Sequence, residues 1–418
     1  MQLPTWLTAR NASWFACLLC LTSLSTSKAL QSISIALLGA AALWQLWEAG
    51  NLQAFRYNRY AWLLAGIFAL TLISFFYTEN LGQWSRDVKG KLLFCAIPLS
   101  LGGMLGFSVR QYRGIWYGFI LSQSIVAGIS LFRYWQNFEK VNEAIGKNAN
   151  IDIIGNMSHI YFGLLLAVSV MLGLYLWRNF RPIWGKWERV LILGVTILNI
   201  VFLHILTSRT GLLTFYAGLF SLGGWISWQK RRIWPILTLL GIMVAAPVLS
   251  YQLIPSFKTR VDVTLWDIQQ YQPGSQIAAD YSLSSRIFAW QTAWDIFLDQ
   301  PLRGTGIADI EDEMRARAPE QIPMDKRLSN PHNQYLENAA AFGLLGIIWS
   351  LAIIFMAFKI PSFGKNWLAI VFLTMYTTGM VFESLLERQV GICLFCFFLY
   401  LLPDFQQIET EQNHYTGE

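Results

Sequence analysis

The chain has few charges and lacks the motifs that mark most soluble enzymes. Only 13% of its 418 residues are charged and 55% are hydrophobic, which argues against an ordinary soluble domain. It contains no Walker loop, dinucleotide-binding fingerprint, serine-nucleophile elbow or zinc-ligand spacing. An ATP-driven or nicotinamide-dependent activity is therefore not expected. Internal repeats and low-complexity tracts are also absent.

The five cysteines indicate neither a disulfide framework nor a metal centre. Cys17 and Cys20 form one C-x-x-C pair, Cys393 and Cys396 form another, and Cys95 stands alone. Such pairs occur in metal and redox motifs. Here they lie inside apolar runs without a nearby histidine, so we interpret them as small apolar residues. No metal site and no cofactor are expected.

What the chain has in abundance is apolar runs long enough to cross a membrane, which takes about 20 residues in a helix. They predict an all-α polytopic membrane protein with about 12 transmembrane helices. The predicted spans are 12–26, 29–48, 60–77, 92–108, 114–133, 160–178, 188–206, 210–228, 233–251, 337–358, 366–383 and 389–402. The first run resembles a signal peptide, but further spans follow it, so we expect a retained anchor.

The net charge of +6 reflects topology rather than nucleic-acid binding. With the N-terminus inside, basic clusters fall on one side of every hairpin, as the positive-inside rule requires of a cytoplasmic face. These clusters are Arg56 and Arg59, Arg110 and Arg113, Arg178, Arg181, Lys186 and Arg189, Lys230 to Arg232, and Lys359 and Lys365. The sequence thus predicts a multi-pass membrane protein, in a bacterium one of the inner (plasma) membrane, with membrane lipid, and no nucleic acid, as a partner.

The predicted spans divide the chain into four parts. Residues 1–251 carry helices 1–9, and residues 337–402 carry helices 10–12. Between them, residues 252–336 form one large loop that the charge distribution places on the outer side of the membrane, which in a bacterium is the periplasm or cell exterior. Loops of this length usually have a function. Smaller outward segments cover 136–158 and 78–91. Residues 403–418 are expected to be a disordered cytoplasmic tail.

One helix is predicted inside the large loop, starting at Ser284 or Ser285. Its apolar positions repeat at helical spacing and form one stripe, made of Ile287, Trp290, Trp294 and Phe297. Pro301, Gly304 and Gly306 then turn the chain. The stripe suits either a helix lying along the membrane interface or one packed on the loop's own small core.

Three side chains stand out as candidates for chemistry. Arg209 lies at the outer mouth between two spans, and Arg286 lies in the first turn of the loop helix. Arginine presents a planar fork suited to phosphate oxygens, although each could instead be a solvated or lipid-facing cation. His332 stands where the polar loop re-enters the membrane, and an imidazole can take and return a proton near neutral pH. A structural role at the start of a helix is its alternative.

Other charged groups have simpler interpretations. Arg86, Lys89 and Lys91 could extend an anion site, or they could pair with Glu79 and Asp87. The acidic stretch DIEDE at 309–313 could hold a divalent cation. Because no histidine or amide cluster flanks this stretch, we favour a solvated acidic turn.

Three motifs together resemble a known family. They are SRTGLL at 208–213, SSRIFAWQTAW followed by PLRGTG between 284 and 306, and NPHNQYLENAAAFGLLG at 330–346. The combination resembles the O-antigen ligase/polymerase superfamily of bacterial envelope glycosyltransferases. The specific motifs lie between about residues 207 and 346, and the rest of the chain resembles the family only in its hydropathy.

The resemblance implies a GT-C-like helix bundle with one large periplasmic loop and a metal-independent, inverting glycosyltransferase. In the ligases the donor is a glycan on undecaprenyl diphosphate, and the acceptor is a sugar hydroxyl of lipid A–core. By this resemblance His332 matches the catalytic histidine, and Arg209 and Arg286 match the diphosphate-binding arginines. Lys89, Lys91 and Arg86 remain candidate auxiliary anion contacts that match no family motif.

Two further functions stay open. An O-antigen polymerase joins repeat units on the same lipid carrier and tends to have two sizeable outward loops, whereas one loop dominates here. A ligase that glycosylates protein is a variant of the same reaction. A flippase for lipid-linked glycans also fits twelve spans, but transporters usually show paired repeats and ionisable groups near mid-membrane.

Overall fold

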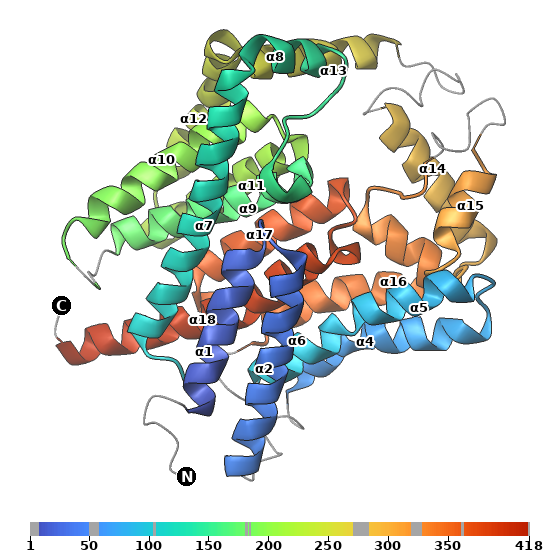
Figure 1. Ribbon diagram of the computed structural model, residues 1–418, viewed down its shortest axis with the longest axis horizontal. Helices are drawn as coiled ribbons and strands as arrows, with labels where there is room; N and C mark the ends of the chain where they lie inside the picture. The colour runs from blue at the N-terminus through green and yellow to red at the C-terminus, as the bar shows by residue number, and fades with distance from the viewer. Residues whose placement is uncertain are drawn as a thin grey trace.

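All regular structure in the described chain is helical. The computed structural model describes residues 8–49, 58–102, 106–179, 183, 185–270, 284–318, 328–360 and 363–416. Every regular element in these ranges is a helix, and Figure 1 shows the helices packed into one bundle. The prediction of an all-α protein is confirmed.

The helices follow one another with mostly short connections. The α-helices are α1 (Ala9–Ser23), α2 (Lys28–Ala49), α4 (Arg59–Ile73), α5 (Leu81–Lys91), α6 (Leu93–Gly102), α7 (Val109–Gln136), α8 (Phe138–Gly146), α9 (His159–Arg178), α10 (Glu188–Leu206), α11 (Arg209–Lys230), α12 (Trp234–Leu253), α13 (Pro255–Gln270), α14 (Ser284–Asp299), α15 (Ile310–Ala316), α16 (Gln334–Ala357), α17 (Trp367–Phe382) and α18 (Gln389–Thr416). Short 3₁₀ segments are η1 (Ser74–Phe76), η2 (Ile154–Asn156), η5 (Phe363–Lys365) and η6 (Leu385–Glu387).

Eight helices in the described residues are long and apolar enough to cross a membrane, namely α2, α4, α7, α9, α10, α12, α16 and α18. The chain is therefore a polytopic membrane protein. The other four predicted spans fall on α1, α6, α11 and α17. Of these, α6 has 10 residues, α1 has 15 and α17 has 16, fewer than the roughly 20 that a straight crossing needs. Twelve crossings thus remain a prediction.

Burial sorts the helices into a core and a lipid-facing rim. In α9 and α18 most residues of the spanning segment are buried, which suits helices that are apolar all round. By contrast, α12 is almost entirely exposed along its apolar length. In Figure 1, α17 and α18 pass through the middle of the bundle and α12 lies at its edge. An apolar helix exposed in this way is suited to contact with lipid.

The end of α18 differs from the expected disordered tail. The helix continues past Pro403 to Thr416, so that prediction is wrong. Glu409 explains the extension, because its carboxylate pairs with the fully buried Arg113 of α7 and accepts a hydrogen bond from Tyr175 of α9. A buried arginine needs such a partner. Hydropathy alone carries no signal for this pairing, which joins residues 296 positions apart.

The large loop contains helices α13, α14 and α15, and α14 confirms the helix predicted from Ser284. Its most buried positions, however, are the small residues Ala289 and Ala293 together with Ile296, while Trp294 is 47% exposed. The small side chains let α14 approach α16 closely, against which it packs. The predicted aromatic stripe is therefore not the main buried face. The helix packs against the spanning helix α16 rather than on a core of the loop itself, and its predicted position along the membrane interface stays a prediction.

The two glycine-rich motifs dock onto each other. The backbone N–H of Thr305 donates to Ala340 O at 2.9 Å, and that of Leu344 donates to Pro301 O at 2.8 Å. Gly304 and Gly343 allow this approach because both have positive φ, +68° and +60°. A Cβ on Gly304 would lie 2.5 Å from the oxygen of Ala340. The motifs thus fix the loop to α16, the helix that follows His332.

Gly304→Ala is expected to destabilise the protein by about 2 kcal/mol or more, because it adds a left-handed non-glycine residue and a backbone clash. The measurement is the apparent melting temperature in detergent. Gly241→Ala is the matched control, since nothing lies within 4 Å of a Cβ at that helical position. Equal melting temperatures for the two variants would contradict the docking described above.

Candidate active site

Five chain segments meet around a cavity of about 310 Å³ that has His332 in its wall. They are the turn between α1 and α2, the start of α9, the segment before α16, the end of α17 and the start of α18. His332 has φ +51°, and its backbone N–H donates to Asn330 Oδ1 at 2.6 Å. Asn333 caps α16 by accepting from the N–H groups of Tyr335 and Leu336. The two amides thereby hold the histidine at the entrance of the helix.

The imidazole of His332 is oriented by a carboxylate. Its Nδ1 lies 3.1 Å from both Oε1 and Oε2 of Glu383, the residue that follows α17. Since a carboxylate only accepts, Nδ1 carries the proton and Nε2 keeps its lone pair. Nε2 makes no hydrogen bond to any residue that the structure describes. The ring is thus set up to accept a proton from a molecule in the cavity.

The same carboxylate reaches Arg286. Its Oε2 lies 3.7 Å from Arg286 Nη2, and both side chains are largely buried. Burial lowers the pKa of Arg286, while the charge of Glu383 acts in the opposite direction. The histidine and one arginine predicted from the sequence therefore lie together. The acid that joins them was missed, and its one sequence signal is a carboxylate directly after an apolar span.

Arg209, the first residue of α11, belongs to the same group of charges. Its Nη2 donates to Thr264 Oγ1 on α13 at 2.8 Å. It lies close enough to Arg286 and Asp267 for their charges to act on it. Asp267 in turn accepts from Ser284 Oγ at 2.6 Å, which ties α13 to the start of α14. All three predicted site residues are therefore brought to one region.

A third arginine and a second histidine were not predicted. Arg260 of α13 donates to the side chains of Asn148 and Asn150, each at 3.1 Å. Burial, and then the positive charge of Arg209, lower the pKa of Arg260 to about 10. His159, the first residue of α9, is within electrostatic range of all three arginines and of Glu383. Neither residue lies in a motif that marks it as functional.

Two of the arginines line a separate apolar cavity. Arg209 and Arg260 border a space of about 210 Å³ whose remaining wall comes mainly from Leu212, Phe257 and Leu265. This cavity lies between α11 and α13 and shares no lining residue with the cavity at His332. Guanidinium groups over an apolar wall suit a ligand with an anionic head and a hydrocarbon chain.

The three candidate auxiliary cations lie elsewhere. Lys91 is buried and pairs with Glu387 at 2.6 Å, so its charge is already balanced. Arg86 donates to Gln83 of its own helix, and Lys89 is exposed. None of the three lines either cavity. The alternative of an ion-pair network is the one observed for Lys91, with Glu387 as the partner.

Asp87, one turn before Lys91, has no partner for its buried Oδ2 among the described residues. Burial and, next, the charge of Glu387 raise the pKa of Asp87 to about 6. Because the folded-state pKa is raised, the protonated form contributes stability that is full below about pH 4, where an unfolded aspartate is also protonated. This contribution is lost as the pH rises through about 6.

Asp87→Asn is therefore expected to raise the apparent melting temperature at pH 7.5 by roughly 1 to 3 °C. The gain should shrink between about pH 6 and pH 4. Glu79→Gln, at an exposed acid just before the same helix, serves as the control. A gain for Asp87→Asn that is the same at every pH would contradict the burial of an ionised aspartate.

The acidic stretch at 309–313 is occupied by protein contacts. Asp309 accepts from the backbone N–H groups of Glu79 and Asn80, and Asp312 accepts from the Asn80 side chain at 2.8 Å. Glu311 and Glu313 pair with Arg315 and Arg317 along α15. Within the described ranges no group of three or more His, Cys, Asp or Glu side chains could hold a metal ion. The stretch anchors α15 to the segment before α5.

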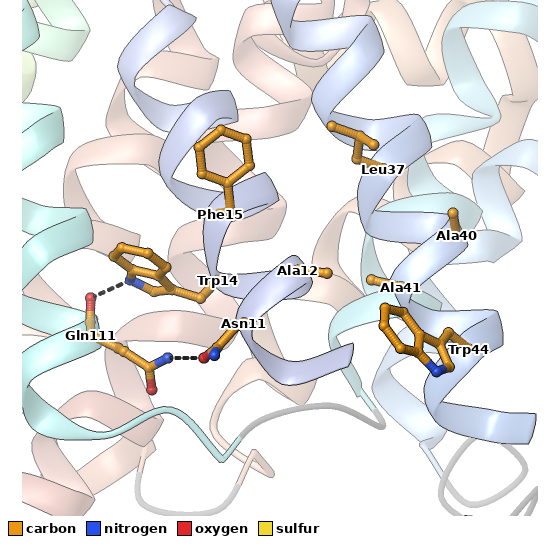
Figure 2. A pocket seen from close by; sticks show the side chains of 9 residues that line it. All are labelled: Asn11, Ala12, Trp14, Phe15, Leu37, Ala40, Ala41, Trp44 and Gln111. Atoms are coloured by element: carbon orange, nitrogen blue, oxygen red, sulfur yellow. Dashed lines mark hydrogen bonds between the residues drawn. The ribbon is translucent and has the colours of Figure 1, made fainter. Parts of the chain in front are cut away.

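A third cavity, of about 590 Å³, lies between α1 and α2 at their other ends. Figure 2 shows Trp14 and Phe15 on one side and Leu37 and Trp44 on the other. Its polar members bond each other, since Gln111 accepts from Trp14 Nε1 at 2.9 Å and donates to Asn11 at 3.0 Å. It has no charged side chain in its lining, so it offers no chemistry of the kind gathered around His332.

A comparison with protein families assigns the central part of the chain. Residues 194–351 match the model of the O-antigen ligase family. This segment is an O-antigen ligase domain. It includes Arg209, Arg260, Arg286 and His332, whereas Glu383 lies beyond its end. No curated protein matches the chain.

The O-antigen ligase domain sets the broad activity of this membrane protein. Proteins of this family transfer glycans in the bacterial envelope, and their substrates are lipid-linked glycans. The domain accordingly implies a glycan-transferring enzyme. The three arginines and His332 lie within the domain. Glu383, the carboxylate that orients His332, follows α17 and lies outside the domain.

Proposed function

We propose that this protein is an O-antigen ligase, which moves a glycan from undecaprenyl diphosphate to a sugar hydroxyl of lipid A–core. The observation that carries this proposal is the chain of contacts from His332 through Glu383 to Arg286. It joins a proton acceptor to a phosphate-binding group within an O-antigen ligase domain. An enzyme that transfers an acyl group to a hydroxyl would need the same base. It would not need a group of arginines that binds a lipid diphosphate.

The arginines would bind the donor. The charge of Arg286 acts on Arg209 and that of Arg209 acts on Arg260, so a diphosphate bound among them would relieve this mutual repulsion. The apolar cavity beside Arg209 and Arg260 would receive the first prenyl units. As the glycosidic bond breaks, negative charge grows on the diphosphate. Preorganised guanidinium groups in a water-poor site stabilise this charge.

His332 would act as the base. Its Nε2 takes the proton of the acceptor hydroxyl while the hydroxyl oxygen attacks the anomeric carbon. The bond between that carbon and the phosphate oxygen breaks, and undecaprenyl diphosphate leaves with the electron pair. Attack from the face opposite the leaving group inverts the anomeric configuration. Glu383 is a positioning residue, because it holds the Nδ1–H tautomer and stabilises the imidazolium that forms.

The site would face the periplasm of a bacterial inner membrane. Lys230 stands at the end of α11 opposite to Arg209, and Lys359 follows the end of α16 opposite to His332. Arg178 stands at the end of α9 opposite to His159. By the positive-inside rule these basic ends are cytoplasmic. Arg56 and Arg181, which belong to the same pattern, lie outside the described residues. The large loop with α13, α14 and α15 is then periplasmic.

An O-antigen polymerase is the second candidate. The segment after α7 is the second sizeable outward connection, and it takes part in the site because Asn148 and Asn150 bind Arg260. Two outward segments that share one site are a feature expected of polymerases. The large loop still supplies two of the three arginines, Arg260 and Arg286, and the histidine, which favours the ligase.

The lipopolysaccharide profile of a deletion strain tests the proposal. Loss of a ligase leaves bare lipid A–core, whereas loss of a polymerase leaves core with a single repeat unit. Loss of a flippase depletes periplasmic donor, which would be seen as lipid-linked glycan trapped on the cytoplasmic face. We expect bare lipid A–core, restored by the wild-type chain. Core with one repeat unit would contradict the ligase.

Glycan transfer by the purified protein is expected to persist in excess EDTA, since guanidinium groups rather than a metal ion balance the diphosphate charge. The measurement is the initial rate with EDTA and again after Mg²⁺ or Mn²⁺ is added. A rate that falls to background in EDTA and returns with either ion would contradict metal independence.

A further inference from the structure

A chain of hydrogen bonds connects the backbone of His332 to a buried glutamate. The N–H of His332 donates to Asn330 Oδ1 at 2.6 Å, and Ser384 Oγ lies 3.0 Å from the same oxygen. Ser384 Oγ also lies 3.0 Å from Oε2 of Glu337, which stands in the first turn of α16. Ser384 is 1% exposed and Glu337 is 6% exposed. The candidate base is therefore linked to a carboxyl group that lies away from solvent.

The number of protons in this chain indicates the state of Glu337. Asn330 Oδ1 must be an acceptor, because the amide nitrogen in its place would meet the N–H of His332 donor to donor. A serine hydroxyl has one proton, so Ser384 can donate to Asn330 or to Glu337 but not to both. An ionised Glu337 would leave one of the two 3.0 Å contacts without a proton. A protonated Glu337 donates to Ser384, which then donates to Asn330, and every contact has one donor and one acceptor.

The charges around Glu337 favour the same state. Lys91 is the cation that acts on it, but Lys91 Nζ is already bound to Glu387 Oε1 at 2.6 Å. The carboxylates of Glu387 and Asp87 act on Glu337 as well. Three acids thus share one lysine in a buried region, which favours a proton on one of the acids. Glu337 is the one whose hydrogen bonds require that proton.

Ser384 connects the chain to the ring of His332 as well as to its backbone. It directly follows Glu383, whose carboxylate orients Nδ1 of the imidazole. Its backbone oxygen accepts from the hydroxyl of Tyr161 on α9 at 3.1 Å, which fixes this part of the chain. His332 has φ +51°, a conformation that is uncommon outside glycine, so the bond to Asn330 helps to keep it there.

We propose that Glu337 is a neutral carboxylic acid and a positioning residue for glycan transfer, which acts on His332 and Glu383 through Ser384. Glu337 lines neither the cavity at His332 nor the apolar cavity between α11 and α13, so it does not touch a substrate in either. Ionisation of Glu337 would draw the proton of Ser384 away from Asn330 and loosen the backbone of His332. The role in transfer rests on the proposed function, whereas the protonated state does not.

Infrared spectra of the full-length protein in nanodiscs at pH 7.5 test the protonated state. We expect the difference between the wild type and Glu337→Gln to contain the carbonyl stretching band of a protonated carboxylic acid. Glu311→Gln is the control, because Glu311 pairs with Arg315 and its replacement should remove only carboxylate bands. A difference spectrum for Glu337→Gln with carboxylate bands and no acid band would overturn the proposal.

The rates of glycan transfer test the positioning role. Glu337→Met removes the donor to Ser384 and is expected to reduce kcat by roughly 10- to 100-fold, as a small displacement of a catalytic group does. The KM values should change little, since neither substrate touches the side chain. Glu337→Gln should recover most of this loss, because an amide N–H donates to Ser384 as the acid does. Ser384→Ala interrupts the same chain and should lower kcat as Glu337→Met does, which keeps the test open if Glu337→Met does not insert.

Two kinetic results would overturn the positioning role. One is an equal kcat for Glu337→Met and Glu337→Gln, and the other is a loss that appears in KM while kcat is unchanged. An acid band in a protein that transfers no glycan would overturn the proposed function and leave the neutral acid standing. Normal transfer by a protein without the acid band would do the reverse.

Discussion

His332→Ala is expected to reduce glycan transfer by roughly 10²- to 10⁴-fold, the range over which a positioned general base contributes. The fold should survive, because the side chain is one-third exposed and its contacts are to Glu383. The measurement is the initial rate of label transfer to lipid A–core by the reconstituted protein. His204→Gln is the matched control. The ring of His204 forms a hydrogen bond with Tyr216, and His204 lines neither the cavity at His332 nor the apolar cavity between α11 and α13.

Glu383→Gln sharpens this test. An amide can donate to Nδ1 and so favour the wrong tautomer of His332, which leaves the ring in place without a lone pair on Nε2. The rate constant kcat should fall while the KM for acceptor stays within a few-fold. A structural role for the carboxylate would instead lower the melting temperature and raise both KM values. Full activity of either His332→Ala or Glu383→Gln would remove the proposed base.

Arg286→Ala is expected to lower kcat/KM for the donor by roughly 10²- to 10³-fold, as the loss of one preorganised oxyanion-binding group does. Arg286→Lys should recover only part of the loss, because a lysine keeps the charge but not the planar fork. The measurement is kcat/KM for the undecaprenyl diphosphate donor at saturating acceptor. Arg303→Ala provides the control, since that arginine contacts Tyr77 and Gln300 at the surface of the same loop.

A rate for Arg286→Lys equal to that of the wild type would mean that the position supplies charge alone. A rate for Arg286→Ala within a few-fold of the wild type would place the diphosphate elsewhere. Arg260 of α13 and Arg209 of α11 would then be the remaining arginines that can donate hydrogen bonds to the diphosphate.

The presence of long apolar helices could be predicted because lipid imposes it. Each apolar run needs its backbone hydrogen bonds satisfied internally, so a helix follows from hydropathy alone. Side-chain partners were harder to predict. The extension of α18 depends on Glu409 reaching Arg113, and the buried face of α14 depends on Ala289 and Ala293 fitting against α16. Both are long-range contacts that local periodicity does not encode.

The candidate site shows the same division. His332, Arg209 and Arg286 could be found because each has a placement that costs free energy or a motif around it, and the structure brings them together. Glu383 and Arg260 could not, since a charge near a helix end is ordinary until its neighbours are known. Lys91 illustrates the converse. It resembled a free cation in the sequence, but Glu387, 296 positions away, neutralises it.

The most direct test of the central claim is a reconstituted reaction with a labelled glycan on undecaprenyl diphosphate and lipid A–core in the same vesicles. The proposed mechanism predicts labelled lipid A–core with inverted anomeric configuration, one undecaprenyl diphosphate released per transfer, and no product with His332→Ala. Three results would contradict this mechanism. The labelled glycan could only become longer on its lipid carrier, it could cross the bilayer unchanged, or it could reach lipid A–core with retained anomeric configuration.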